Sequence, residues 1–453
     1  MQITLAPVKI PAFEIPETRP AIPAETFAAR CDTLFQRADC DWVVVYADRE
    51  HQANIAFLTG FEPRFEEALL LLGRAGERII VTGNESSSYT AIAGLEGVET
   101  VLSQSMSLMG QDRSRKPNLE QVLSDCGIKA GQSIGLVGWK YLEPGESEDA
   151  GYFLPHHFVR VLQRLAGDKG ALSDVTGLLM HETDGLRAVV DADEIAMLEW
   201  GAARASVAVW RILSQARPGE SELTAAARMG YAGEPMSCHF MLSAQNASAD
   251  VIGLSSPSSR TLRLGDGITT AVGYWGGLSS RAGLLGDGDD AFLAKAAGYF
   301  EALVTWYETA DIGTEGGTLY KAAEDALARH GLDTALNPGH LLSHDEWMNT
   351  PIRKGGNGLI ASGMPVQVDV IPVPMNKGQA LNCEDAVVFA DDSLREDIRL
   401  KHPQMFARMM ARRDFVRDAL GIDLKPCVLP LSNTPLCLAP FWLKHDHLLV
   451  HGR

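Results

Sequence analysis

The sequence predicts a two-domain protein in which an α/β domain is followed by an α+β domain with an antiparallel sheet. The first observation is the length of 453 residues, because single hydrophobic cores stop growing near about 250–300 residues. The second is an alternation of strand and helix patterns in the first part of the chain. The third is a set of helices that flank short strands in the second part. The composition, 46% apolar and 22% charged, is that of a globular protein.

The first domain is expected to cover residues 1–173. After a Pro-rich leader, residues 23–39 have the spacing of an amphipathic helix, and a run of β-formers follows from Asp41. Further elements are expected in this domain: strands at Glu67–Leu72, Arg78–Thr82 and Ser133–Val137, and a helix at Asn118–Asp125. Alternating strands and helices are typical of an α/β layer domain.

The second domain is expected to cover residues 174–393. A long helix is predicted over Asp193–Gln215, because its apolar spacing is helical and Pro218 and Gly219 stop it. The other expected elements are helices at Ser221–Met229, from Asp289 to Thr309 and over Leu319–His330, and strands between 239 and 282, at 364–371 and at 384–390. Helices around short strands in this order predict an α+β domain.

Residues 394–453 form a C-terminal extension. It begins as a basic helical stretch and continues as an apolar segment interrupted by prolines. An apolar tail has to be covered, so it packs either on its own domain or on a second subunit.

Composition narrows the set of partners and compartments. The net charge of −18 argues against nucleic acids and anionic membranes, which would repel this chain. The N-terminus has no signal-peptide pattern, and no apolar run approaches the roughly 20 residues that span a bilayer. The seven cysteines are scattered without a close pair, which favours reduced thiols. We therefore expect a cytoplasmic protein.

Six short motifs follow one another between about residues 20 and 390. They are Asn54-Ile-Ala-Phe-Leu-Thr-Gly-Phe61, Arg187 with Asp193-Glu194-Ile195, Leu264-Gly265-Asp266, Pro338-Gly339-His340, Gly363-Met364 and Cys383-Glu384-Asp385. This order resembles the creatinase, prolidase and methionine aminopeptidase family of M24 peptidase-like proteins. The resemblance implies a creatinase-type N-terminal α/β domain and a pita-bread C-terminal domain with a curved antiparallel sheet. It also implies a homodimer.

The resemblance implies a metal site as well. Most relatives hold two metal ions with two aspartates, one histidine and two glutamates. In this chain the histidine falls on His340, the first glutamate on Asp369 and the second on Glu384. A single Mn, Zn or Fe ion on these three residues is one alternative, and a metal-free site, as in creatinase, is the other.

The two aspartates of the family site have no evident counterpart. The strand pair that should carry them offers Ala271 and Gly277 or Leu278 instead. A shifted alignment to the family pattern would put Asp266 at the position of the first aspartate ligand, but the match of Gly265-Asp266 to its motif would then be lost. We therefore expect no dinuclear site, because two close cations need a bridging carboxylate.

Several other side chains are candidates for the site. His340 or His344 is expected to move a proton, since the pKa of a histidine lies near the working pH. Three residues are candidate substrate contacts, namely Trp275, Arg281 and Trp347. Arg281 would bind a carboxylate through two hydrogen bonds. His239 is a further candidate in the place of a lost family histidine. Core packing is an equally good interpretation of the two tryptophans and the arginine.

Two acidic residues of the same region receive a different interpretation. Asp345 and Glu346 follow His344 directly, and we interpret them as helix-cap or surface charges.

The function that these expectations favour is hydrolysis of a C–N or amide bond in a small amino-acid-derived molecule, distinct from ordinary dinuclear peptidase chemistry. Two alternatives stay open. One is a lyase on the same scaffold, in which a base removes a proton next to a carboxylate. The other is a non-catalytic binding protein that keeps the fold.

Overall fold

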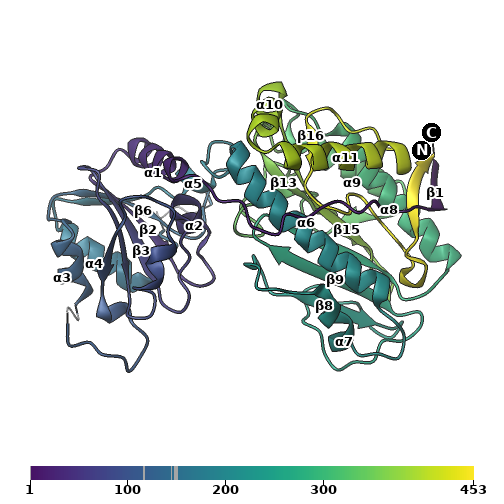
Figure 1. Ribbon diagram of the computed structural model, residues 1–453, viewed down its shortest axis with the longest axis horizontal. Helices are drawn as coiled ribbons and strands as arrows, with labels where there is room; N and C mark the ends of the chain where they lie inside the picture. Colours follow the sequence, from purple (N-terminus) through teal and green to yellow (C-terminus); the bar gives the residue numbers. More distant parts are fainter. Residues whose placement is uncertain (1, 116–117, 144, 147–150, 453) are drawn as a thin grey trace. The chain divides into compact units, whose positions relative to one another are not determined.

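The computed structural model describes residues 2–115, 118–143, 145–146 and 151–452. Its chain divides into two compact units (Figure 1), of which one is Ala21–Ala188 and the other combines Met1–Pro20 with Val189–Arg453. The leader, expected in the first domain, therefore belongs to the C-terminal unit. The reason is β1 (Gln2–Pro7), which pairs antiparallel with β17 (His447–Gly452).

The unit Ala21–Ala188 contains one six-stranded mixed sheet. Its strand order is β5-β4-β3-β2-β6-β7. The strands are β2 (Trp42–Ala47), β3 (Ala68–Gly73), β4 (Arg78–Thr82), β5 (Glu99–Leu102), β6 (Ser133–Val137) and β7 (Ala171–Asp174). Strands β2, β3 and β4 are antiparallel neighbours, while β5, β6 and β7 add in parallel.

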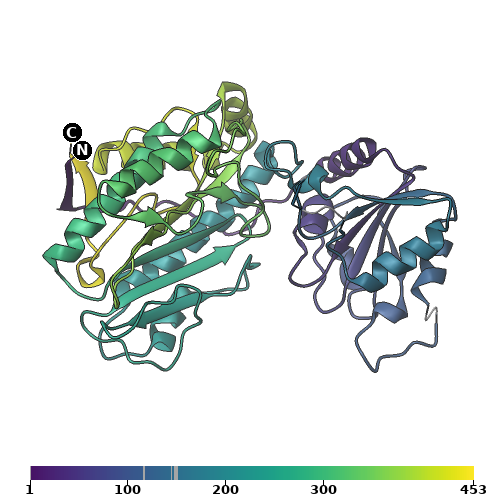
Figure 2. The same ribbon diagram turned by 180° about the vertical axis from the view of Figure 1, so that it is seen from behind.

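Helices cover both faces of this sheet (Figure 2). They are α1 (Ala24–Ala38), α2 (Ala53–Thr59), α3 (Leu119–Asp125), α4 (His156–Ala166) and the short α5 (Gly177–Met180). The core of one face joins Trp42, Val44 and Tyr46 of β2 to Leu123 of α3 and Leu162 of α4. Side chains alternate along a strand, so the intervening residues of β2 face α1 and α2. This is the predicted α/β layer architecture.

The C-terminal unit is organised around a curved antiparallel sheet. Its strand order is β12-β13-β15-β10-β9-β8, with β16 paired to β15. The strands are β8 (Met241–Gln245), β9 (Gly267–Tyr274), β10 (Gly277–Leu284), β12 (His340–Leu341), β13 (Pro365–Val368), β15 (Asn382–Phe389) and β16 (Val428–Pro430). A separate two-stranded ladder joins β11 (Asp333–Thr334) to β14 (Pro372–Val373). The single strand expected over 364–371 is therefore shorter and ends before Asp369.

Six helices of this unit surround the sheet: α6 (Ala192–Gln215), α7 (Glu222–Ala226), α8 (Asp290–Thr309), α9 (Gly316–Ala328), α10 (Asp392–Lys401) and α11 (Pro403–Ala419). Helix α6 packs on β9 and β10. It begins where the Asp191 carboxylate accepts a hydrogen bond from the amide of Glu194, and its first turn is acidic, which suits the helix dipole.

The C-terminal extension packs on its own unit. After α11, the apolar segment around Leu436 and Leu438 is buried, and β16 adds to the sheet edge beside β15. Its last strand is the partner of β1. Within the described part of the chain, no helix has the length and apolarity needed to cross a membrane.

Helix α6 approaches the β9–β10 turn closely at Gly201. A Cβ atom on this residue would overlap the carbonyl oxygen of Trp275. The glycine is therefore required by packing, although alanine is the better helix former by about 1 kcal/mol. Backbone contact at this point fixes how α6 lies on the sheet.

We predict that Gly201→Ala destabilises the protein by roughly 1–3 kcal/mol or more, because the added methyl group overpacks a rigid backbone contact. The midpoint of urea unfolding measures the change. Gly286→Ala is the matched control, since a Cβ atom there has nothing within 4 Å. Equal midpoints for the two variants would contradict the packing argument.

Candidate active site

A cavity of about 490 Å³ opens on the sheet of the C-terminal unit. Alternate residues of three strands line it, because successive side chains of a strand point to opposite faces. The lining residues from these strands are Thr269 and Ala271 of β9, Leu278, Ser280 and Ala282 of β10, and Asn382 and Glu384 of β15. The strand register places Met241, Ala271, Ser280 and Glu384 in one row across four strands.

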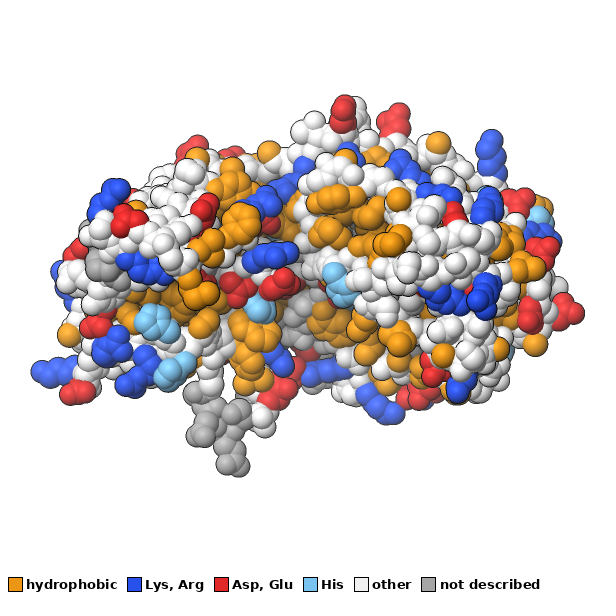
Figure 3. Space-filling view, turned by 90° about the horizontal axis from the view of Figure 1, so that it is seen from below, with side chains coloured by type: hydrophobic (Ala, Val, Ile, Leu, Met, Phe, Trp, Pro, Cys, Tyr) orange, Lys and Arg blue, Asp and Glu red, His pale blue; other side chains and the backbone are white. Residues whose placement is uncertain are grey.

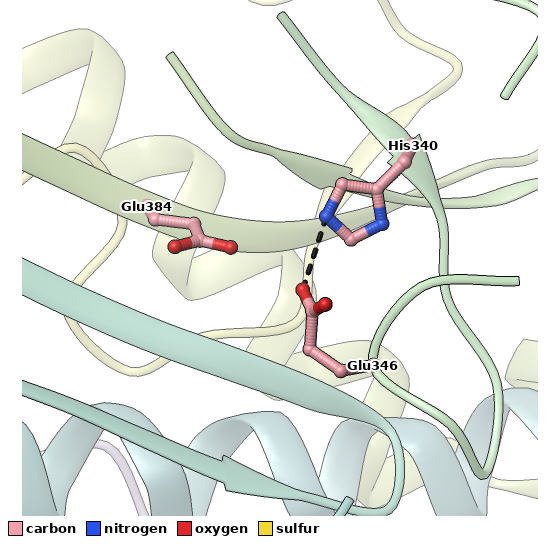
Figure 4. Close-up of side chains that lie close together, drawn as sticks. All are labelled: His340, Glu346 and Glu384. Atoms are coloured by element: carbon pink, nitrogen blue, oxygen red, sulfur yellow. Dashed lines mark ion pairs between the residues drawn. The ribbon is translucent and has the colours of Figure 1, made fainter. Parts of the chain in front are cut away.

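An acidic cluster with one histidine lies at this cavity. Glu384 comes from β15, Asp369 follows β13, Glu346 lies in the loop after β12, and His340 belongs to β12. Figure 4 shows the His340 ring and the carboxylates of Glu346 and Glu384 directed toward one another. One potential ligand atom from each of these three residues lies within 4.8 Å of the other two.

His340 is held in a defined orientation. Its ring is fully buried and stacks on the indole of Trp347, with 4.1 Å between ring centroids and 18° between planes. Nε2 lies 3.1 Å from a Glu346 carboxylate oxygen, and Nδ1 lies 3.3 Å from the Leu341 carbonyl oxygen. Burial lowers the pKa of His340, but Glu346 and Asp369 raise it by more, so the net shift is upward. The imidazolium form is therefore more stable here than in an ordinary histidine.

Asp369 and Glu384 are buried carboxyl groups that resist ionisation. Burial raises the pKa of Asp369 to about 7, although His340 acts in the opposite direction. Burial, followed by the charges of Asp369 and Glu346, raises the pKa of Glu384 well above its ordinary value. The Oδ1 atom of Asp369 has no hydrogen-bond partner among the described residues. Such groups are expected to exchange protons near neutral pH or to receive a cation.

Two of the predicted substrate contacts line the cavity. One is Trp347, whose indole stacks on His340. His239 lies exposed at the rim, where its Nε2 is 2.9 Å from the Leu254 carbonyl oxygen. Neither placement establishes a role in binding, so both roles stay predictions.

Arg281, predicted as a substrate contact, points away from the cavity. It lies between Ser280 and Ala282 on β10 and therefore faces the opposite side of the sheet. Its fully buried guanidinium donates to Asp385 at 2.8 Å, and to the carbonyl oxygens of Cys437 at 2.8 Å and Thr434 at 2.6 Å. In this arrangement Arg281 connects the sheet to the C-terminal extension, on the side of the sheet opposite to the cavity.

His344 and Trp275 also lie outside the lining of the cavity. The ring of His344 packs edge-to-face on Trp275 with centroids 4.8 Å apart, and its Nδ1 is 3.7 Å from a Glu194 carboxylate oxygen on α6. The guanidinium of Arg19 lies over the indole of Trp275, 5.0 Å from its centroid. The side chains of His344 and Trp275 are buried. Packing is the interpretation that the structure favours for them.

The strand pair expected to carry the family's aspartates has no carboxylate at the cavity. Ala271 and Leu278 occupy lining positions instead. Asp266 is buried elsewhere, 2.8 Å from the Arg260 guanidinium, and accepts a hydrogen bond from the amide of Arg263. Its place in the structure explains its charge without a ligand role.

Glu346 is the member of the cluster that sequence reasoning missed. We expected a cap or a surface charge, but its carboxylate lines the cavity and faces His340. The signal that could have found it is weak. It is an acidic residue six positions after the histidine, next to the Trp347 that stacks on that histidine.

The donor set fits one divalent cation. One imidazole nitrogen and two carboxylates are the ligands of many mononuclear sites, and such sites leave positions open for water. The ligand atoms of His340, Glu346 and Glu384 all lie within 4.8 Å of one another, near enough to hold one ion. The unpartnered oxygen of Asp369 lies in the same cavity wall.

The comparisons with known proteins point to one fold. The Xaa-Pro dipeptidase of Bacillus anthracis is 16% identical, with a TM-score of 0.61, over 82% of this chain and 96% of that chain. The prolidase of Thermococcus sibiricus is 16% identical, with a TM-score of 0.63, over 82% and 95%. The dipeptidase PepE of Mycobacterium ulcerans is 19% identical, with a TM-score of 0.59, over 82% and 94%.

Sequence comparison adds no relative to these structures. No family model matches the chain, and no curated protein matches it significantly. The structural neighbours nevertheless confirm the predicted fold, an α/β domain followed by a pita-bread domain with a curved antiparallel sheet.

We predict that Asp369→Asn, in the presence of a chelator, stabilises the protein more at about pH 8 than at about pH 5. The raised pKa means that the folded protein keeps a proton that the unfolded chain releases above roughly pH 4. The free energy of unfolding of the unsubstituted protein therefore falls as the pH rises from about 4 to 7. Asparagine removes this dependence.

The expected gain at the higher pH is on the order of 1–3 kcal/mol, since one pKa unit corresponds to about 1.4 kcal/mol. Urea unfolding of both proteins at the two pH values measures it. Stability curves that stay parallel across this range would show that Asp369 ionises as easily in the folded protein as in the unfolded chain.

Proposed function

We propose that this chain is a hydrolase of a C–N or amide bond in a small, amino-acid-derived molecule. The observation that carries the proposal is the cluster of His340, Glu346 and Glu384 with Asp369 at one cavity. The cluster combines the imidazole of His340, whose pKa is raised, with the carboxyl groups of Asp369 and Glu384, whose pKa values are raised by burial. These are the groups that general acid and base steps of hydrolysis need.

Each member of the cluster receives a role. Asp369 and Glu384 would orient the attacking water or the substrate nitrogen, because their carboxyl groups face the cavity. Asp369, with a pKa near 7, would take the proton of that water. His340 would donate a proton to the leaving nitrogen, and Glu346 would keep the imidazole in its cationic form.

A metal ion is compatible with the same residues. His340, Glu346 and Glu384 would hold it, so the proton-donor role of His340 applies to the site without a metal ion. When bound, a divalent ion supplies Lewis-acid polarisation and lowers the pKa of water. In that case Asp369 would remain the residue that holds or moves the proton of the water.

A lyase is the second candidate, and one observation favours it. A buried carboxyl group with a pKa of about 7 is suited to removing a proton next to a carboxylate. Such a reaction consumes no water, so the two functions are distinguishable by their products. The homodimer and the cytoplasmic location stay predictions from the sequence.

We predict about one equivalent of divalent metal per chain in protein purified without chelator. A single donor set of three residues can hold one ion, and the neighbouring strands β9 and β10 supply no carboxylate for a second. Inductively coupled plasma mass spectrometry of the protein and of a His340→Ala, Glu384→Ala variant measures it. Metal should disappear from the variant, and two equivalents in the unsubstituted protein would contradict a mononuclear site.

We predict that hydrolysis in ¹⁸O-labelled water places the label in the acid product, because water supplies the new oxygen atom. Amide and dipeptide substrates are tested with product analysis by mass spectrometry. Glu346→Gln should lower kcat/KM roughly 10²- to 10⁴-fold, the range for loss of acid–base assistance.

Glu324→Gln is the matched control for that substitution. Glu324 forms a surface ion pair with Lys354 at 2.9 Å, so its loss should leave kcat/KM unchanged.

Turnover that yields an unlabelled, unsaturated product would reject hydrolysis and support the lyase.

A further inference from the structure

The charged side chains that line the cavity are of one sign. Asp250, Glu346, Asp369 and Glu384 all contribute carboxyl groups to its wall. No lysine or arginine lines the cavity in the part of the chain that the structure describes, and His239 is the one lining residue that can become cationic. A ligand carboxylate would meet these acidic groups and no lysine or arginine, because the buried ring of His340 faces Glu346 and does not line the cavity.

Three other buried carboxylates of this unit are paired with arginine. Asp266 lies 2.8 Å from Arg260, Asp385 lies 2.8 Å from Arg281, and Glu199 lies 2.6 Å from Arg412. Buried charges are normally compensated in this way.

Asp369 departs from this rule. The residue is 5% exposed, and its Oδ1 has no hydrogen-bond partner among the described residues. Its Oδ1 therefore offers the cavity a buried acceptor atom that no described side chain occupies.

The remainder of the wall is largely apolar and continues to the surface. Leu254 is 73% exposed, Leu336 is 47% exposed and Trp347 is 38% exposed, and all three line the cavity. Exposed apolar side chains around a concave site are typical of ligand-binding grooves. The indole of Trp347 also offers an aromatic face, which attracts cations.

We propose that the ligand of this cavity is a small apolar molecule that carries a positively charged nitrogen and no carboxylate. This inference rests on the proposed function and names its substrate class. One divalent ion would compensate two of the four carboxyl groups, so the wall would stay acidic when a metal is bound. A free dipeptide has a C-terminal carboxylate, and that end would find no cationic partner here.

Three probes of similar shape test the inference. We would titrate the protein with 3-phenylpropylamine, 3-phenylpropanol and 3-phenylpropionate by isothermal calorimetry at about pH 8. The amine should bind at least tenfold more tightly than the alcohol, and the acid more weakly than the alcohol. An amine that binds no more tightly than the alcohol, or does not bind at all, overturns the inference. We expect the protein to prefer the amine equally after EDTA treatment. If EDTA abolished the preference, a bound metal ion would cause it, and the inference from the carboxyl groups would be overturned.

Two variants connect the preference to the cavity. Asp369→Asn, which preserves shape, should reduce the advantage of the amine over the alcohol at least fivefold. Leu336→Lys places a cation at the exposed rim and should reduce it without disturbing the core. An unchanged advantage in both variants would overturn the inference. The proposed function is rejected separately. A protein that prefers the amine but hydrolyses no substrate is not the proposed hydrolase. A protein that hydrolyses a substrate with a free carboxylate and does not prefer the amine does not have the proposed substrate class.

Discussion

The buried ion pair between Arg281 and Asp385 is the interaction that fixes the direction of the side chains in the cavity wall. The guanidinium joins β10 to Asp385 on β15 and to the backbone of the C-terminal extension at Thr434 and Cys437. Because adjacent residues of a strand face opposite sides, holding Asp385 on one side places Glu384 in the cavity. A slip of one residue would exchange the two acids. The same alternation on β10 puts Ser280 into the cavity opposite Glu384. A structural ion pair thus sets the direction of a candidate catalytic carboxylate.

Acidic side chains on the two sides of this sheet differ in whether a cationic partner compensates them. On the side of Arg281 the charges are compensated within the chain, and the loss of either partner would leave a buried charge alone. On the cavity side Asp369 and Glu384 are buried beside other carboxyl groups, so both resist ionisation. The second arrangement is unfavourable for the empty protein and becomes favourable when a proton or a cation arrives. This contrast is physical evidence that the cavity is a site, independent of any likeness to other proteins.

Local sequence patterns predicted the elements whose stability is local. Strand β2 is a run of β-formers buried on both faces, and α6 has helical spacing, an Asp191 cap and a proline after its end. The direction of Arg281 was not predictable, because the glycine- and serine-rich β10 does not indicate which face is buried. Glu346 was missed because it lies in a loop, where no periodicity assigns a direction. Its role depends on contacts with His340 that arise from the tertiary fold.

The pairing of β1 with β17 constrains the order of events during biosynthesis. Leu5 and Leu449 are cross-strand partners, so β1 is synthesised before the segments that separate it from β17 and can pair only after them. The unit Ala21–Ala188 is contiguous and can form its core in the meantime. The C-terminal unit is closed by a contact of very high sequence separation, which carries a large entropy of loop closure. Until then the strand is an unpaired edge, the kind of segment that chaperones protect from aggregation.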